Sequence, residues 1–144
     1  ARTYRRAIDD YLTSEEKYQS NMDWYRAEIG KCTYRQFTTG FYFGKPDENT
    51  QIYESSTYRN ESVYLGTVGA VDERGRAKIE QRNKFCVGDF IEIMKPDGTD
   101  VKTKVLSLTT EEGESVESAP HPKQVLYVEM TGQAAAGDIL RMDA

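Results

Sequence analysis

The spacing of apolar and aromatic residues changes once along this chain, near residue 58, and this change constrains the fold more than any other feature. Before it, four tyrosines recur every seven residues, which places them along one side of a helical stretch. They are Tyr4, Tyr11, Tyr18 and Tyr25. After it, short runs alternate between apolar and polar residues and end at Gly-containing turns, which is typical of strands. The chain is therefore predicted to join a helical arm to a mainly β domain.

The arm is predicted to be broken into short helices. Ser14 follows Thr13 and precedes two glutamates, and hydroxyl residues followed by acids mark a helix start. Asn21 is expected to begin a further helix over residues 22–29, which Gly30 ends. The tyrosine face is too polar to form a core by itself, so we expect it to contact a further domain.

Six short strands are predicted in the rest of the chain. They are residues 62–68, 76–81, 90–94, 101–108, 125–130 and 139–142. Two of them follow a Gly-Asp pair, at Gly88-Asp89 and Gly137-Asp138, where glycine permits a tight turn and aspartate can accept hydrogen bonds from nearby amides. Short strands separated by such turns predict a small antiparallel β-barrel preceded by the helical arm. The Gly-Asp turns resemble those of the barrel that forms the second domain of translation elongation factors.

No complete active site is visible in the sequence. His121 is the only histidine, and Cys32 and Cys86 lie 54 positions apart, so neither a nucleophile–base pair nor a metal cluster is predicted. The sequence has none of the glycine-rich motifs that bind nucleotides, and no cofactor is expected. No apolar run reaches the roughly 18 residues of a membrane helix. We expect a cytoplasmic protein with no membrane partner.

Three consecutive aromatic residues, Phe41, Tyr42 and Phe43, stand between Gly40 and Gly44. They could stack on bases, as aromatic residues do on surfaces that bind single-stranded nucleic acid. They could instead pack the helical arm onto the barrel, since burying one phenylalanine stabilises a fold by roughly 1.5–3 kcal/mol. We favour the packing interpretation.

One stretch in the acidic half of the chain is basic. The formal net charge is −5, which argues against a generic nucleic-acid binder, and all of it falls in residues 61–144. Five basic residues and one acid there occupy even positions: Arg74, Arg76, Lys78, Glu80, Arg82 and Lys84. If the stretch is extended, all six lie on one face, opposite Ala77 and Ile79. One interpretation is that this face binds a polyanion, foremost tRNA, or an acidic surface of the parent protein. The other is that it is an ordinary solvated strand face.

Several segments are similar to the collagenase-like U32 peptidases. Residues 34–46 (YRQFTTGFYFGKP) resemble the linker of that family, and residues 4–9 (YRRAID) resemble the last helix of its catalytic domain. Residues 81–89, 119–124 and 137–141 resemble its C-terminal barrel. The match spans nearly the whole chain and is more specific than any single short motif.

The resemblance implies a preceding catalytic domain that is absent here. Residues 1–36 would be a helical arm and linker from the end of that domain, and residues 37–144 the C-terminal β-barrel domain. The chain is then expected to be a non-catalytic accessory or substrate-binding module of a peptidase that acts on collagen-like protein. The alternative is an RNA-positioning module, because other members resemble enzymes that hydroxylate uridine in tRNA using prephenate. The expected partners are the catalytic domain of the same polypeptide and either a collagen-like protein or tRNA.

Overall fold

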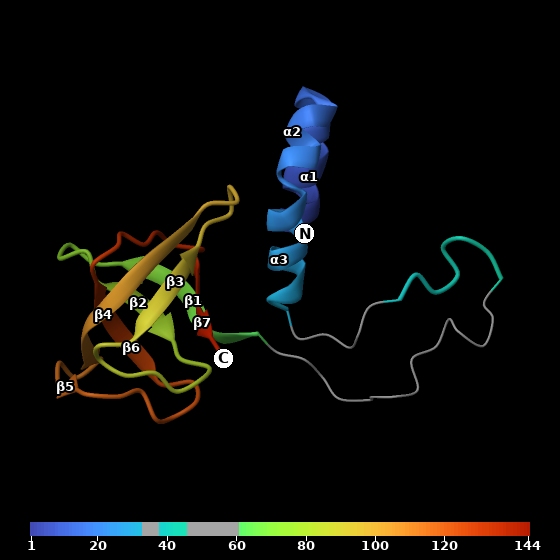
Figure 1. Cartoon of the computed structure of the whole chain (residues 1–144). Helices are drawn as coiled ribbons and strands as arrows, with labels where there is room; N and C mark the ends of the chain where they lie inside the picture. The colour runs from blue at the N-terminus through green and yellow to red at the C-terminus, as the bar shows by residue number, and fades with distance from the viewer. Residues whose placement is uncertain (33–37, 46–60) are drawn as a thin grey trace.

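Helices come first along the chain and strands follow, as the change of spacing predicts. The computed structural model describes residues 1–32, 38–45 and 61–144 (Figure 1). The helices are α1 Arg2–Thr13, α2 Glu15–Ser20 and α3 Met22–Gly30. The strands are β1 Ser62–Val71, β2 Ala77–Glu80, β3 Phe90–Met94, β4 Asp100–Thr110, β5 Ser115–Val116, β6 Val125–Met130 and β7 Ile139–Asp143.

The helices form a hairpin in which α1 runs beside α2 and α3 (Figure 1). Ser14 separates α1 from α2, and its hydroxyl accepts a hydrogen bond from the backbone N–H of Lys17 at 3.1 Å, so the predicted helix start is confirmed. The Asp10 carboxylate accepts hydrogen bonds from the Tyr25 hydroxyl at 2.7 Å and the Asn21 amide at 3.0 Å. Hydrogen bonds from Tyr25 and Lys17 lower the pKa of Asp10 to about 2.

The seven strands form one antiparallel sheet in the order β3-β7-β1-β2-β6-β4-β5. β3 and β4 are also paired with each other. This pairing closes the row of the six longer strands into a cycle, in which each strand pairs with two of the other five. The structure thus confirms a mainly β, antiparallel fold preceded by a short helical arm. The expected domain boundary between residues 36 and 37 lies within 33–37, outside the described residues.

Alternation along the strands produces the core. In β2, Ala77 and Ile79 are buried while Lys78 and Glu80 are not. The core side chains are Leu65, Val68, Ala77, Ile79, Phe85, Ile91, Ile93, Val105, Leu108, Ala119, Leu126, Val128 and Leu140. Gly66 allows β1 to approach β2, because a Cβ there would lie 2.8 Å from the Glu80 carbonyl oxygen.

The two Gly-Asp turns adopt the same local structure. Gly88 has φ 94° and Gly137 has φ 93°, a region that L side chains rarely adopt. The carboxylates of Asp89 and Asp138 each accept a hydrogen bond from the backbone N–H three residues earlier, both at 2.8 Å. The predicted role of these turns before β3 and β7 is therefore confirmed.

Charged side chains, rather than apolar ones, hold the hairpin to the sheet. Within the described residues, none of the core side chains comes from a helix. Arg141 on β7 instead donates a hydrogen bond to Glu28 on α3 at 3.0 Å, and Arg2 on α1 donates to the same carboxylate at 2.6 Å. Arg2 also donates to Asp100 on β4 at 2.8 Å. Trp24 lies under the guanidinium of Arg6, 4.3 Å from the ring centroid.

The cluster at this junction balances its charges although it is removed from water. Its three cations and three carboxylates are Arg2, Lys31, Arg141, Glu28, Glu92 and Asp100. Glu28 and Arg141 are only 5% and 8% exposed. Burial alone would raise the pKa of Glu28, but the hydrogen bond from Lys31 and the charge of Arg141 outweigh it, and the pKa is lowered. Burial also acts to raise the pKa of Glu92, but hydrogen bonds from Arg141 and Lys31 outweigh it and lower the pKa.

Replacing Glu28 with Gln should loosen the hairpin while leaving the sheet folded. The change leaves three cations facing two carboxylates, and a hydrogen bond to a charged group contributes roughly 1.5–3 kcal/mol. Amide hydrogen exchange in residues 2–30 should become on the order of 30-fold faster, and exchange in β4 should stay unchanged. Asp23→Asn is the matched control, because the Asp23 side chain is fully exposed. Equal exchange in the two variants would contradict the role given to Glu28.

The junction should also open at low pH. Carboxylates whose pKa is lowered in the folded state contribute stability that is complete above their ordinary pKa, 4.5 for Glu28 and Glu92, and is lost as pH falls through the lowered values. Trp24, the only tryptophan, reports on the hairpin. Its fluorescence should be constant from pH 7 to 5 and change below about 4.5. A transition centred above pH 5 would rule out these carboxylates as its cause.

Candidate functional site

The basic stretch does not lie on one strand face. Lys78 is the only basic residue inside β2, and Arg76 is the residue directly before the strand. Arg74 lies in the preceding turn, while Arg82 and Lys84 follow the end of the strand. The expected burial of Ala77 and Ile79 on the opposite face is confirmed, but the extended stretch that would align all the cations ends at Glu80.

Three of the five basic residues already have carboxylate partners. Arg76 pairs with Asp72 at 2.8 Å, Lys78 with Glu111 at 2.8 Å, and Arg82 with Glu80 at 2.9 Å. Exposed pairs of this kind contribute little stability, but they reduce the positive charge offered to a polyanion. Arg74 and Lys84 are exposed, and neither has an ion pair within the described part of the chain.

The three consecutive aromatic residues form an exposed turn. Phe41, Tyr42 and Phe43 are 78%, 84% and 82% exposed. The backbone turns where the Tyr42 N–H donates to the Thr39 carbonyl at 2.9 Å. The favoured interpretation, in which these side chains pack the arm onto the sheet, is therefore wrong, because such packing would bury them. Their exposure leaves the base-stacking interpretation as a prediction.

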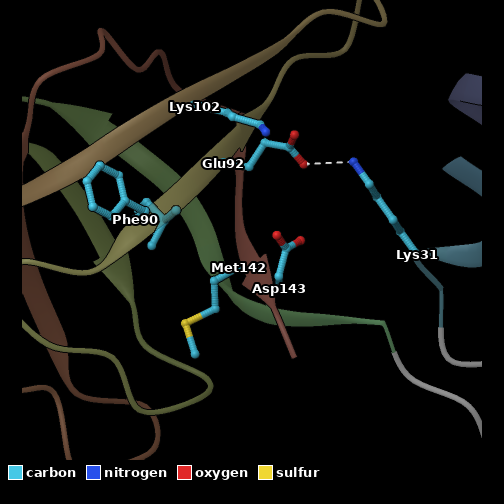
Figure 2. A pocket seen from close by; sticks show the side chains of 7 residues that line it. Lys31, Phe90, Glu92, Lys102, Met142 and Asp143 are labelled. Carbon is cyan, nitrogen blue, oxygen red and sulfur yellow. Dashed lines mark hydrogen bonds and ion pairs between the residues drawn. The ribbon is translucent and has the colours of Figure 1, made fainter. Parts of the chain in front are cut away.

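A pocket of about 440 Å³ lies where the end of α3 meets strands β3, β4 and β7 (Figure 2). Its lining residues are Lys31, Phe90, Ile91, Glu92, Lys102, Met142 and Asp143. Glu92 accepts hydrogen bonds from Arg141 at 2.6 Å and from Lys31 at 3.2 Å, and the second of these is drawn in Figure 2. The pocket therefore depends on the same charged cluster that holds the hairpin.

The pocket is not among the sites predicted from the sequence, although the alternation of residues in β3 indicates that Phe90 faces outward. Ile91 and Ile93 are buried, so Phe90 must lie on the opposite face, where it is 77% exposed. In register with Phe90 on β4 is Lys104, whose ammonium lies 5.6 Å from the ring centroid. The predicted strand over residues 90–94 contains Phe90, but only the burial of Ile91 and Ile93 shows that its side chain lies on the outer face.

The tyrosine face is assembled across the hairpin rather than along one helix. Tyr11 and Tyr18 lie 5.6 Å apart between ring centroids, as do Tyr18 and Tyr25. Tyr25 is buried, whereas the other three line an open apolar groove of about 380 Å³. Its lining residues are Tyr4, Ala7, Ile8, Tyr11, Leu12 and Tyr18. Within the structure described, this groove has no covering element and is a candidate contact for another domain.

Catalytic groups are not gathered anywhere in the described residues. Among residues 1–32, 38–45 and 61–144, no three His, Cys, Asp or Glu side chains are placed to hold a metal ion. His121 is exposed, Cys32 is exposed and Cys86 is half-buried. No helix in these ranges is both long and apolar enough to cross a membrane. The described surface presents exposed aromatic side chains, among them Phe41, Tyr42, Phe43 and Phe90.

Known proteins match this chain over most of its length. A tRNA hydroxylation protein P1 from Bacillus subtilis (strain 168) is 25% identical over 139 residues, which are 96% of this chain and 33% of that protein. A tRNA hydroxylation protein P from Haemophilus influenzae is 29% identical over 121 residues, which are 83% of this chain and 25% of that protein. The chain thus spans a quarter to a third of these relatives.

A solved structure has the same fold as the β domain. It is the C-terminal domain of a U32 peptidase from Geobacillus thermoleovorans, in its selenomethionine variant, and its TM-score is 0.51 at 25% sequence identity. The likeness covers 56% of this chain and 99% of that one. The family model described as the peptidase family U32 C-terminal domain matches residues 60–141, which contain all seven strands except the last two residues of β7. The chain therefore belongs to peptidase family U32, and residues 60–141 are its C-terminal domain.

Proposed function

We propose that this chain is the RNA-positioning module of a protein that hydroxylates tRNA. The observation that carries the proposal is the extent of the match: proteins named for tRNA hydroxylation align with 96% and 83% of this chain. An accessory role in proteolysis, the first expectation from the sequence, has support only from the family's description and the name of the solved structure. Uridine as the target and prephenate as the co-substrate belong to this proposal.

Chemistry in this proposal takes place in the rest of the polypeptide. The described residues offer no nucleophile–base pair and no metal cluster, and the relatives are three to four times longer than the matched region. The apolar groove of Tyr4, Tyr11 and Tyr18 would contact the catalytic domain of the same polypeptide. The charged cluster would then transmit the position of that domain to the sheet, because it fixes the hairpin on β4 and β7.

The sheet in this proposal acts as a rigid platform. The cycle of pairings through six strands supports a small barrel of the kind predicted from the sequence, similar to the second domain of elongation factors. Residues 37–144 would form this platform, and residues 1–36 the arm that links it to the catalytic domain. Its place of action would be the cytoplasm, where tRNA is found.

Removing residues 61–144 from the full-length protein should abolish tRNA hydroxylation in cells that lack the natural gene. The expected cause is lost positioning, so the affinity for tRNA should fall as well, while the remaining protein still unfolds cooperatively on heating. Hydroxylated uridine is measured by mass spectrometry of digested tRNA. Binding of the intact protein should weaken with salt, with a slope of roughly 0.7–0.9 per phosphate contacted.

Gelatin cleavage, measured for the intact protein and for the protein without residues 61–144, tests the alternative accessory role in proteolysis. Full hydroxylation without residues 61–144 would contradict the proposal. Gelatin cleavage that needs these residues, with tRNA binding unaffected by their removal, would restore the peptidase-accessory function.

A further inference from the structure

The outer face of β3 and β4 carries an exposed aromatic ring beside two lysines. Phe90 on β3 is paired in register with Lys104 on β4, and the next outward position of β4 is Lys102. The Lys104 ammonium lies 5.6 Å from the Phe90 ring centroid, and Lys102 lines the same pocket as Phe90 (Figure 2). Residues two apart on a strand are about 7 Å apart along it, so the two ammonium groups can meet separate anionic groups.

The fold itself gives no reason for a phenylalanine at this position. Its neighbours Ile91 and Ile93 are 3% and 0% exposed and contribute to the core, whereas Phe90 is 77% exposed. Alternation along β3 prevents Phe90 from turning inward without moving both isoleucines outward. An aromatic ring held open on a strand is the usual platform on which a nucleic-acid base stacks.

Charge at this face remains available for a ligand. Among the described residues neither Lys102 nor Lys104 has an ion pair, although Lys102 is in register with Glu92. Glu92 is neutralised by Arg141 and Lys31, which leaves Asp143 as the one other carboxylate that lines the pocket.

This face differs from the basic stretch around β2 in how much of its charge is paired, although Arg76 and Lys78 there also lie beside a ring, 5.1 and 5.7 Å from the centroid of Tyr127. Three of the five cations there are paired with carboxylates, as described above. Around the cycle of strand pairings, β2 lies three steps from β3 in either direction, and β6 separates it from β4.

We infer that Phe90, Lys102 and Lys104 bind a single-stranded segment of RNA, with one base stacked on Phe90 and neighbouring phosphates held by the two lysines. The inference rests on the proposed function for the identity of the ligand as RNA. It adds the place of contact, which neither the family description nor the names of the relatives assign.

Binding of an unmodified tRNA transcript by the full-length protein tests this inference. Phe90→Ala should weaken binding by about tenfold, the size expected for one stacked base. Phe90→Leu should weaken it similarly, because leucine keeps apolar contact but offers no ring face. Lys102→Gln with Lys104→Gln should weaken binding and lower the salt slope by about 1.4, at roughly 0.7 per phosphate of a single strand. All three positions are on the outer face, and thermal melting checks that the variants fold.

A matched control removes the same charge elsewhere. Arg26→Gln with Lys123→Gln also neutralises two exposed cations, neither of which lines the pocket beside Phe90 or belongs to the basic stretch around β2, and should change tRNA affinity less than threefold at physiological salt, a small general effect of net charge. An equal loss of tRNA affinity in both double variants would overturn the inference, since it would mean that tRNA is attracted only by the overall charge of the protein.

The remaining outcomes separate the inference from the proposed function. If the unaltered protein shows no salt-dependent binding of tRNA, the proposed function itself fails. If it binds tRNA and the Phe90 and Lys102/Lys104 variants bind equally well, only the inference fails. Loss of gelatin binding with tRNA binding retained would make this face a protein-binding surface and also overturn the inference.

Discussion

The ion pair between Arg141 and Glu28 joins residues 113 positions apart and sets where the helical hairpin lies on the sheet. No helical side chain enters the core formed by the described residues, so apolar packing cannot fix this position. Buried ion pairs of this kind contribute little net stability, because desolvation offsets much of their attraction. Their geometry is nonetheless demanding, since a shifted hairpin would separate Glu28 from Arg141 and Arg2 from Asp100. We conclude that the cluster determines orientation more than stability.

Two surfaces depend on this orientation. One is the pocket beside Phe90, because Lys31 reaches it from the end of α3 and shares Glu92 with Arg141. The other is the tyrosine groove, whose direction relative to the sheet is set by the anchoring of Arg2 at the start of α1. If the groove contacts a catalytic domain and the β3–β4 face contacts RNA, the charged cluster determines the distance between chemistry and bound substrate.

Much of the fold could be predicted because alternation and turn chemistry are local. Strands β3 and β6 have the bounds expected from the sequence, and the break at Ser14 is where the hydroxyl and acidic residues placed it. Strand β5 was missed because its two residues, Ser115 and Val116, are too few to show a period. The charged cluster was missed for another reason: its partners are brought together only by the tertiary fold.

The candidate sites were harder to predict, because they depend on which aromatic side chains are exposed and on which basic side chains form ion pairs. The basic stretch was expected on one face, yet regular alternation stops at Glu80, and acids from a turn and a distant loop neutralise part of it. The expectation for Phe41 failed because aromatic composition alone does not show whether a partner surface is within reach. Phe90 carried a usable signal, since its side of β3 follows from the two isoleucines.

Crosslinking of tRNA to the full-length protein with ultraviolet light, followed by mass spectrometry of the modified peptides, shows where the RNA lies on the protein. If the module positions RNA on the β3–β4 face, a nucleotide adduct should map to the peptide that contains Phe90. Adducts found only outside residues 61–144 would contradict this position of the RNA, because the β domain would then not contact it.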